Sequence, residues 1–188
     1  MVAENYIQDF TELYKELCEK VTANIEEIAW QDLWHNQVNF LQDEHPFPTP
    51  ALFYAIRIID VDDLSEKAQD CNVQVDMYHY FETFADTYVG SYNQESALAF
   101  LQNCKKVYQL FHSTNGESYS GMRRIAFTPV DTGDAGNLYR QSFVCQLRDL
   151  SAMDEFNTFT PGDVDVIKGT VPIVEPNDES YKLPTSGT

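Results

Sequence analysis

Three prolines within five residues, Pro46, Pro48 and Pro50, constrain the fold of this chain more than any other feature. Proline fixes φ and lacks a backbone N–H, so the segment that holds them belongs to neither a helix nor a central strand. Residues 51–59 follow at once and are apolar except for Arg57. A short apolar run after such a break predicts a strand. Because its apolar residues occupy both faces, we expect an interior strand that is covered on both sides.

The spacing of apolar residues predicts two helices and four further strands. The helices are expected over residues 3–23 and 93–112. The strands are expected over residues 27–33, 72–82, 122–130 and 138–150. A charged turn over residues 60–63 and an acidic loop over residues 64–71 are expected to follow the strand that begins at residue 51. This order predicts an α+β fold with one mainly antiparallel sheet and two helices packed on it.

The strand over residues 72–82 alternates clearly, which predicts a half-buried strand. The apolar face holds Val73, Val75, Met77, His79 and Phe81. The other face includes Asp76, Tyr78 and Tyr80, around which a diffuse enzymatic site is conceivable. The sequence offers no nucleophile paired with a base in support of such a site.

The composition changes at residue 151, which predicts an α+β domain over residues 1–150 and an extended acidic arm over residues 151–188. The arm holds half of the eight prolines and seven acidic residues against two lysines. Its apolar residues include Val164, Val166, Ile167, Val171 and Ile173. These residues are too many for a solvated tail and too few for a core, so we expect the arm to lie on a neighbouring subunit or another protein.

The formal net charge of −18 argues against two kinds of partner. Nucleic acids are bound through Lys and Arg that neutralise phosphates, and anionic membranes attract the same residues. No apolar run approaches the roughly 20 residues of a membrane-spanning helix. We therefore expect neither nucleic acid nor membrane among the partners.

The sequence has neither of the phosphate-binding motifs GxxxxGK(S/T) and GxGxxG, and it has no GxSxG nucleophile motif. The histidines lack the spacing of metal ligands: His35, His45, His79 and His112. The cysteines are scattered and are interpreted as reduced core thiols: Cys18, Cys71, Cys104 and Cys145. The sequence therefore predicts no enzyme, no cofactor and no metal site.

The few basic residues indicate where subunits would meet. Arg123 and Arg124 are adjacent, and Arg140 and Arg148 share one face of the last predicted strand because an even number of residues separates them. In so acidic a chain these arginines are interpreted as partners for carboxylates across a subunit interface.

One segment and the order of elements resemble a known family. The segment includes Trp30, Trp34 and Gln37 and continues into the sequence PFPTPA at residues 46–51, which leads into a strand. In these features the chain resembles bacteriophage tail-terminator and tail-completion proteins, particularly those predicted from prophages of Bacteroides-type bacteria. The similarity covers residues 3–150.

The resemblance implies a structural subunit without catalysis, which assembles with copies of itself in a ring. Sixfold symmetry is favoured, and twelvefold symmetry stays open. Such a ring caps the tail tube or joins it to the head, contacts other neck and tail proteins, and lets DNA pass without binding it. The resemblance also places the protein in the virion, after assembly in the cytoplasm of the bacterial host. The arm and the acidic loop depart from the simplest members, which leaves the ring of a short-tailed phage open.

An acidic adaptor or binding protein of the bacterial cytosol is the alternative. Its acidity would then match a basic partner. Acidity by itself does not separate the two classes.

Overall fold

The computed structural model describes residues 9–40, 47–82, 85–131 and 136–153, which all fall within the first of the two units of the chain, residues 1–156. These residues form one five-stranded sheet with the order β1-β2-β3-β5-β4. The strands are β1 (Trp30–Leu33), β2 (Ala51–Ser65), β3 (Ala68–Phe81), β4 (Ser120–Val130) and β5 (Asn137–Asp149). Only β1 and β2 are parallel, and every other pair is antiparallel. The predicted α+β fold is confirmed.

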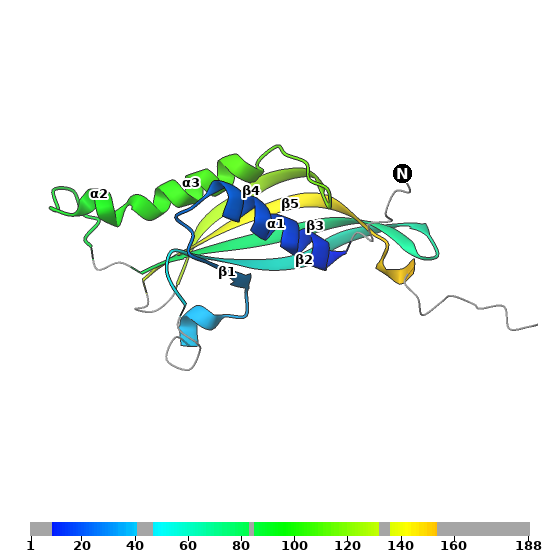
Figure 1. Cartoon of the computed structure of the whole chain (residues 1–188), viewed down its shortest axis with the longest axis horizontal. Helices are drawn as coiled ribbons and strands as arrows, with labels where there is room; N and C mark the ends of the chain where they lie inside the picture. The colour runs from blue at the N-terminus through cyan, green and yellow to red at the C-terminus, as the bar shows by residue number, and fades with distance from the viewer. Residues whose placement is uncertain (1–8, 41–46, 83–84, 132–135, 154–188) are drawn as a thin grey trace, which may run out of the picture. The chain divides into compact units, whose positions relative to one another are not determined.

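Two helices, α1 (Phe10–Asn24) and α3 (Ala99–Phe111), pack on the same face of the sheet (Figure 1). The main core lies between them and the strands. The helices contribute Leu13, Leu17, Val21, Val107 and Phe111 to this core. The sheet contributes Leu52, Tyr54, Val73, Val75, Met77, Phe143, Cys145 and Leu147. We call this side of the sheet the helix-bearing face and the other side the helix-free face.

Both helices differ in extent from the sequence prediction. The first begins at Phe10 rather than at residue 3, because Asp9 adopts an extended conformation and caps it by accepting a hydrogen bond from the Glu12 amide at 2.9 Å. The second is interrupted at Leu98, which separates a short α2 (Gln94–Ala97) from α3. The apolar spacing was correct within each helix, but it did not indicate the ends.

The predicted charged turn and acidic loop at residues 60–71 are wrong. Strand β2 continues to Ser65, a two-residue turn follows, and β3 begins at Ala68. Asp62 lies opposite Asp70 in this hairpin, and Asp70 binds Arg148 of β5 at 2.8 Å. Cross-strand pairing therefore outweighs the local preference of acidic residues for loops.

Burial along the hairpin also differs from the prediction. Strand β2 is covered on both faces only over residues 51–54, and from Arg57 to its end it is exposed. A second core covers the helix-free face near the start of β2 and consists of Val38, Ala51, Phe53, Tyr80 and Leu138. Strand β3, predicted to be half-buried, is buried on both faces over most of its length because it is the central strand.

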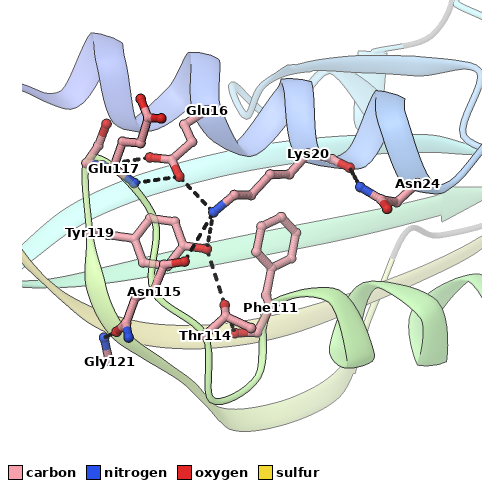
Figure 2. A network of polar contacts seen from close by, with 10 residues as sticks. Glu16, Lys20, Asn24, Phe111, Thr114, Asn115, Glu117, Tyr119 and Gly121 are labelled. Atoms are coloured by element: carbon pink, nitrogen blue, oxygen red, sulfur yellow. Dashed lines mark hydrogen bonds and ion pairs between the residues drawn. The ribbon is translucent and has the colours of Figure 1, made fainter.

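A polar network joins α1 to the loop between α3 and β4 (Figure 2). The Glu16 carboxylate accepts hydrogen bonds from the amides of Glu117 at 3.0 Å and Ser118 at 2.7 Å. Lys20 lies 2.7 Å from the same carboxylate and donates a hydrogen bond to the Tyr119 hydroxyl at 3.0 Å. The network therefore fixes the position of the loop through which the chain returns from α3 to β4.

Candidate assembly interface

One unpaired edge of the sheet belongs to β2. Strand β1 pairs with β2 only as far as Leu33 and Tyr54, and the next contact is a hydrogen bond from the Trp34 amide to the Tyr54 carbonyl at 2.8 Å. Within the described ranges, no strand pairs with this side of β2 from residue 55 onward. Such an edge presents backbone N–H and C=O groups that can pair with another chain.

The side chains along this edge are both apolar and acidic. Ile59 and Leu64 are 54% and 51% exposed, and Ile58 and Val61 are exposed as well. The acidic residues of the same stretch are Asp60, Asp62 and Asp63. Exposed apolar side chains on a free edge are typical of a surface that meets another protein.

A groove with mostly apolar walls lies beside the β2 edge. Its walls come from the start of α1, the end of β1 and the middle of β2: Phe10, Thr11, Tyr14, Leu33, Trp34, Tyr54, Ala55, Ile56, Arg57 and Ile58. The groove therefore lies where a strand added to β2 would place its side chains.

The opposite edge of the sheet is β4, whose described strand partner is β5. Residues 112–114 bridge its outer side at residues 122–124, because Met122 pairs with Thr114 and the Arg124 amide donates a hydrogen bond to His112 Nδ1 at 3.1 Å. Ile125 and Phe127 are 53% and 40% exposed on it. Arg123 is exposed, and no hydrogen bond or ion pair joins it to another described side chain. This edge is therefore apolar and basic, whereas the β2 edge is apolar and acidic.

The four predicted interface arginines lie in different surroundings. Arg124 is on the helix-bearing face, 3.6 Å from the centre of the Tyr108 ring. Arg148 forms two hydrogen bonds, at 2.8 and 3.2 Å, with Asp70 of its own chain. Arg140 is half-buried, and its buried Nε has no hydrogen-bond partner in the described part of the chain. Only Arg123 therefore combines exposure with a charge that no described carboxylate neutralises.

The strand register confirms that Arg140 and Arg148 share a face of the sheet. It also places Arg57, which was not among the predicted interface residues, on that face. Arg57 lies opposite Gln74, Gln74 opposite Val144, and Val144 opposite Arg123, so Arg57 and Arg123 point to the same side of the sheet. Four of the five arginines of the chain thus lie on the helix-free face. Arg57 interrupts an apolar run at the point where β2 becomes exposed. This single charge was the signal in the sequence that could have indicated the exposed edge.

The other predicted interface residues lie outside the described ranges. They are Val164, Val166, Ile167, Val171 and Ile173 of the arm. Their proposed contact with another subunit stays a prediction.

Asp76, the carboxylate of the diffuse enzymatic site considered from the sequence, is buried. Asp76 accepts hydrogen bonds from Gln74 Nε2 at 2.8 Å and from the Ser142 hydroxyl. Tyr78 stacks on Trp34 with 4.1 Å between ring centroids, and Tyr80 belongs to the second core. These side chains contact one another or the core, which is the arrangement of a structural cluster.

His79 belongs to a second buried polar cluster, beneath α3. Its Nε2 lies 2.9 Å from Gln141 Nε2, which also donates a hydrogen bond to the Cys104 carbonyl at 2.7 Å. Burial lowers the pKa of His79 to about 3, so the imidazole is neutral and accepts the amide proton. Burial likewise raises the pKa values of the Cys104 and Cys145 thiols to about 12, far from those of reactive thiolates.

In the described part of the chain, no three His, Cys, Asp or Glu side chains are grouped so that they could hold a metal ion. None of the helices in the described ranges is long and apolar enough to cross a membrane. Comparison of the sequence with models of protein families gives no match, and a search of curated proteins gives none either. The functional argument therefore depends on the geometry of the two sheet edges.

Proposed function

We propose that the protein is a non-catalytic structural subunit of a phage neck or tail, a tail terminator or head–tail joining component that assembles with itself in a ring. One observation carries the proposal: the two edges of the described sheet differ. The β2 edge is unpaired from residue 55 onward and has exposed apolar and acidic side chains, whereas the β4 edge has exposed apolar side chains and Arg123 and is bridged at residues 122–124 by residues 112–114.

Different surfaces on opposite sides of one subunit favour a head-to-tail contact. Such a contact leaves one free surface at each end of every growing assembly, and the assembly stops growing only when a ring closes. Two identical surfaces would instead form a closed dimer. The opposite charges of the two edges also disfavour contact between like edges.

The charge of the chain suits passage of DNA through such a ring. With −18 on each subunit, a ring accumulates a large negative charge that repels phosphates from its inner surface. DNA would then move through without being held. In this proposal the partners are copies of the chain and other neck and tail proteins, and the site of action is the virion.

A cytosolic adaptor is the second candidate, and the acidic β2 edge is the observation that favours it. An adaptor would use this edge to bind a basic protein and would itself stay monomeric. The state of the purified chain separates the two candidates.

Native mass spectrometry and negative-stain electron microscopy of the purified full-length chain test the proposal. We expect one discrete multiple of the 21.6 kDa chain and ring-shaped particles with a central opening. A chain that stays monomeric at concentrations of about 100 μM, far above the Kd of a stable interface, would reject self-assembly. A ring whose solved structure has a lumen of mostly Lys and Arg would reject the passage of DNA.

A further inference from the structure

We propose that the loop over residues 86–92 of one copy inserts into the groove beside β2 of the next copy. This inference rests on the proposed self-assembly and names the two surfaces that meet. We call the loop the tyrosine loop, since it holds Tyr88 and Tyr92, and the groove the β2 groove. The occupant of the β2 groove is therefore a second copy of this chain.

The tyrosine loop presents apolar side chains to solvent. Tyr88 is 65% exposed, Val89 is 93% exposed, and Tyr92 is fully exposed. The three residues lie within five positions of one another and directly precede α2, which extends past one end of the sheet (Figure 1). Single exposed apolar residues are ordinary on a protein surface. A group of large ones on one loop is typical of a site that contacts another protein.

Hydrogen bonds within the loop hold these side chains outward. The Ser91 amide donates to the Tyr88 carbonyl at 3.2 Å, which closes a turn. Asn93 Oδ1 accepts hydrogen bonds from the Asp86 amide at 3.3 Å and from the Ser91 hydroxyl at 2.6 Å. Gly90 has a φ of 92°, a conformation that favours glycine. A loop that is ordered before it binds loses less conformational entropy on binding, so the tyrosine loop is well prepared to act as an anchor.

The β2 groove matches the loop in chemistry and in size. Apart from Thr11 and Arg57, its walls are apolar or aromatic. It encloses about 580 Å³, a volume typical of sites that bury a small ligand, so it has room for a large side chain. Leu33 and Ile58 in its walls are 48% and 44% exposed and would lose this exposure beneath the loop. Tyrosine side chains that fill such pockets often carry much of the binding energy of an interface.

One pair of opposite charges accompanies the apolar surfaces. Arg57 is the one charged residue among the described walls of the β2 groove, and Asp86 is the one charged residue of the tyrosine loop. Both residues are exposed, and no hydrogen bond or ion pair joins either charged group to another residue of the described ranges. An exposed ion pair contributes little by itself. The apolar contact therefore stabilises the interface, and the Arg57–Asp86 pair orients the loop in the groove.

The loop and the groove of one copy lie apart. The groove lies between the start of α1, the end of β1 and the middle of β2. The loop instead leads to α2 and α3, where Phe100 packs on Phe81 of β3 and Tyr139 of β5. Figure 1 shows α2 beyond the end of the sheet and away from α1. Each copy thus offers a loop to one neighbour and a groove to another, which is the head-to-tail contact that a ring needs.

Replacing both tyrosines tests the apolar contact. The full-length chain with Tyr88→Ser and Tyr92→Ser should keep its cooperative thermal transition, because both side chains are exposed. In sedimentation velocity, its concentration for half-maximal assembly should rise about tenfold or more. The matched control with Tyr88→Phe and Tyr92→Phe keeps both rings and should assemble within about threefold of the wild type.

A charge exchange tests which surfaces meet. Arg57→Asp and Asp86→Arg each place like charges at the contact, and each should raise the concentration for half-maximal assembly about tenfold. A 1:1 mixture of the two variants should restore assembly with alternating subunits, because every loop then meets a groove of opposite charge. Glu19→Arg and Lys105→Glu reverse exposed charges on α1 and α3 as controls and should leave assembly unchanged.

Cysteine cross-linking tests the same contact directly. Val89→Cys chains, mixed with tagged Ile58→Cys chains and treated with a short bismaleimide, should give a cross-linked dimer that contains one tagged and one untagged chain. The mixture of Val89→Cys with tagged Lys105→Cys, at an exposed position of α3 outside the groove, should give little or none.

The outcomes separate this inference from the proposed function. If the wild-type chain is monomeric, both proposals fail. If it assembles but the serine variant assembles equally well, or the mixture of charge variants does not restore assembly, the loop-in-groove contact is wrong and self-assembly stands. Cross-linking to Lys105→Cys as strong as that to Ile58→Cys would also overturn the contact. Restored assembly in the mixture shows in addition that both charge variants are folded.

Discussion

The carboxylate of Glu16 in α1 accepts a hydrogen bond at 2.7 Å from the backbone amide of Ser118, which lies 102 positions later in the chain. Lys20 lies 2.7 Å from the same carboxylate, one helical turn away. This single side chain therefore holds the first helix to the loop that leads into the basic edge strand (Figure 2).

Replacing Glu16 should destabilise the domain. Glu16→Ala leaves the amides of Glu117 and Ser118 without their acceptor, and we expect the free energy of unfolding to fall by about 2 kcal/mol, as for a lost hydrogen bond to a charged group. Urea denaturation measures the change. Glu19→Ala, at an exposed position of the same helix, is the control and should change stability by less than about 0.5 kcal/mol. Equal effects from the two variants would contradict the structural role of Glu16.

The contacts of the Glu16 carboxylate also predict that the stability of the fold depends on pH in the acidic range. Burial acts to raise the pKa of Glu16, but hydrogen bonds from Lys20, Ser118 and Glu117 outweigh it and hold the pKa below its ordinary value. The carboxylate therefore stabilises the fold above its unfolded pKa, near 4.5, and this contribution is lost as the pH falls through the lower folded pKa. In Glu16→Ala the loss of stability below pH 4.5 should be smaller than in the wild type.

Gly116 should not tolerate a side chain. A Cβ atom there would lie 2.0 Å from Glu16 Oε1 and 2.5 Å from Tyr119 Cε1. Gly116→Ala must therefore displace the carboxylate, and it should cost about 1–3 kcal/mol. In a double-mutant cycle the substitution should cost clearly less when Glu16 is already alanine, because part of the clash is then gone. Fully additive losses would show that the carboxylate is not the group displaced.

His79 should make the free energy of unfolding depend on pH in a range above that of Glu16. Its pKa is about 3 in the folded chain because burial disfavours the imidazolium, and near 6.5 when unfolded. The unfolded chain therefore binds more protons between these values, so stability falls with decreasing pH by up to about 1.4 kcal/mol per unit. His79→Gln, which keeps a hydrogen-bond acceptor, should remove this slope between pH 6.5 and 5. An equal slope in His79→Gln and in the wild type over this range would contradict the role of His79.

Truncation after Met153 tests the role predicted for the arm. The described helices and strands end by this residue, so the shortened chain should keep a cooperative thermal transition in circular dichroism. Its assembly should weaken in sedimentation velocity, because the arm is predicted to contact a neighbouring subunit. A shortened chain that does not fold would place the arm in the intramolecular core. Normal assembly of a folded one would show that the arm takes no part.

Local patterns predicted most of the elements and several of their faces. The alternation around Val75 and Met77 and the spacing of Leu13, Leu17 and Val21 indicated which side chains enter the core, and the structure buries all of them. Burial of Cys145 and His79 followed from the same patterns. Amphipathic periodicity is a property of a few consecutive residues, so a single sequence is enough to show it.

The candidate interface could not be predicted in the same way. Residues 60–63 contain three aspartates, which locally favour a turn, yet they pair with β3 in a hairpin in which Asp62 lies opposite Asp70. Arg57 stands within an apolar run that is typical of a buried strand, yet it is exposed. The first case depends on pairing with β3, and the second on the end of β1 at Leu33, before it would reach Arg57.

The sequence by itself determined the acidic charge, the break at the prolines, and the positions and inward faces of most strands and helices. Only the tertiary structure decided that β1 ends at Leu33 while β2 continues to Ser65, and that β4 lies at the opposite edge. Whether a strand has a free edge depends on the lengths and registers of its neighbours. These come from packing between distant segments, and no local pattern records them.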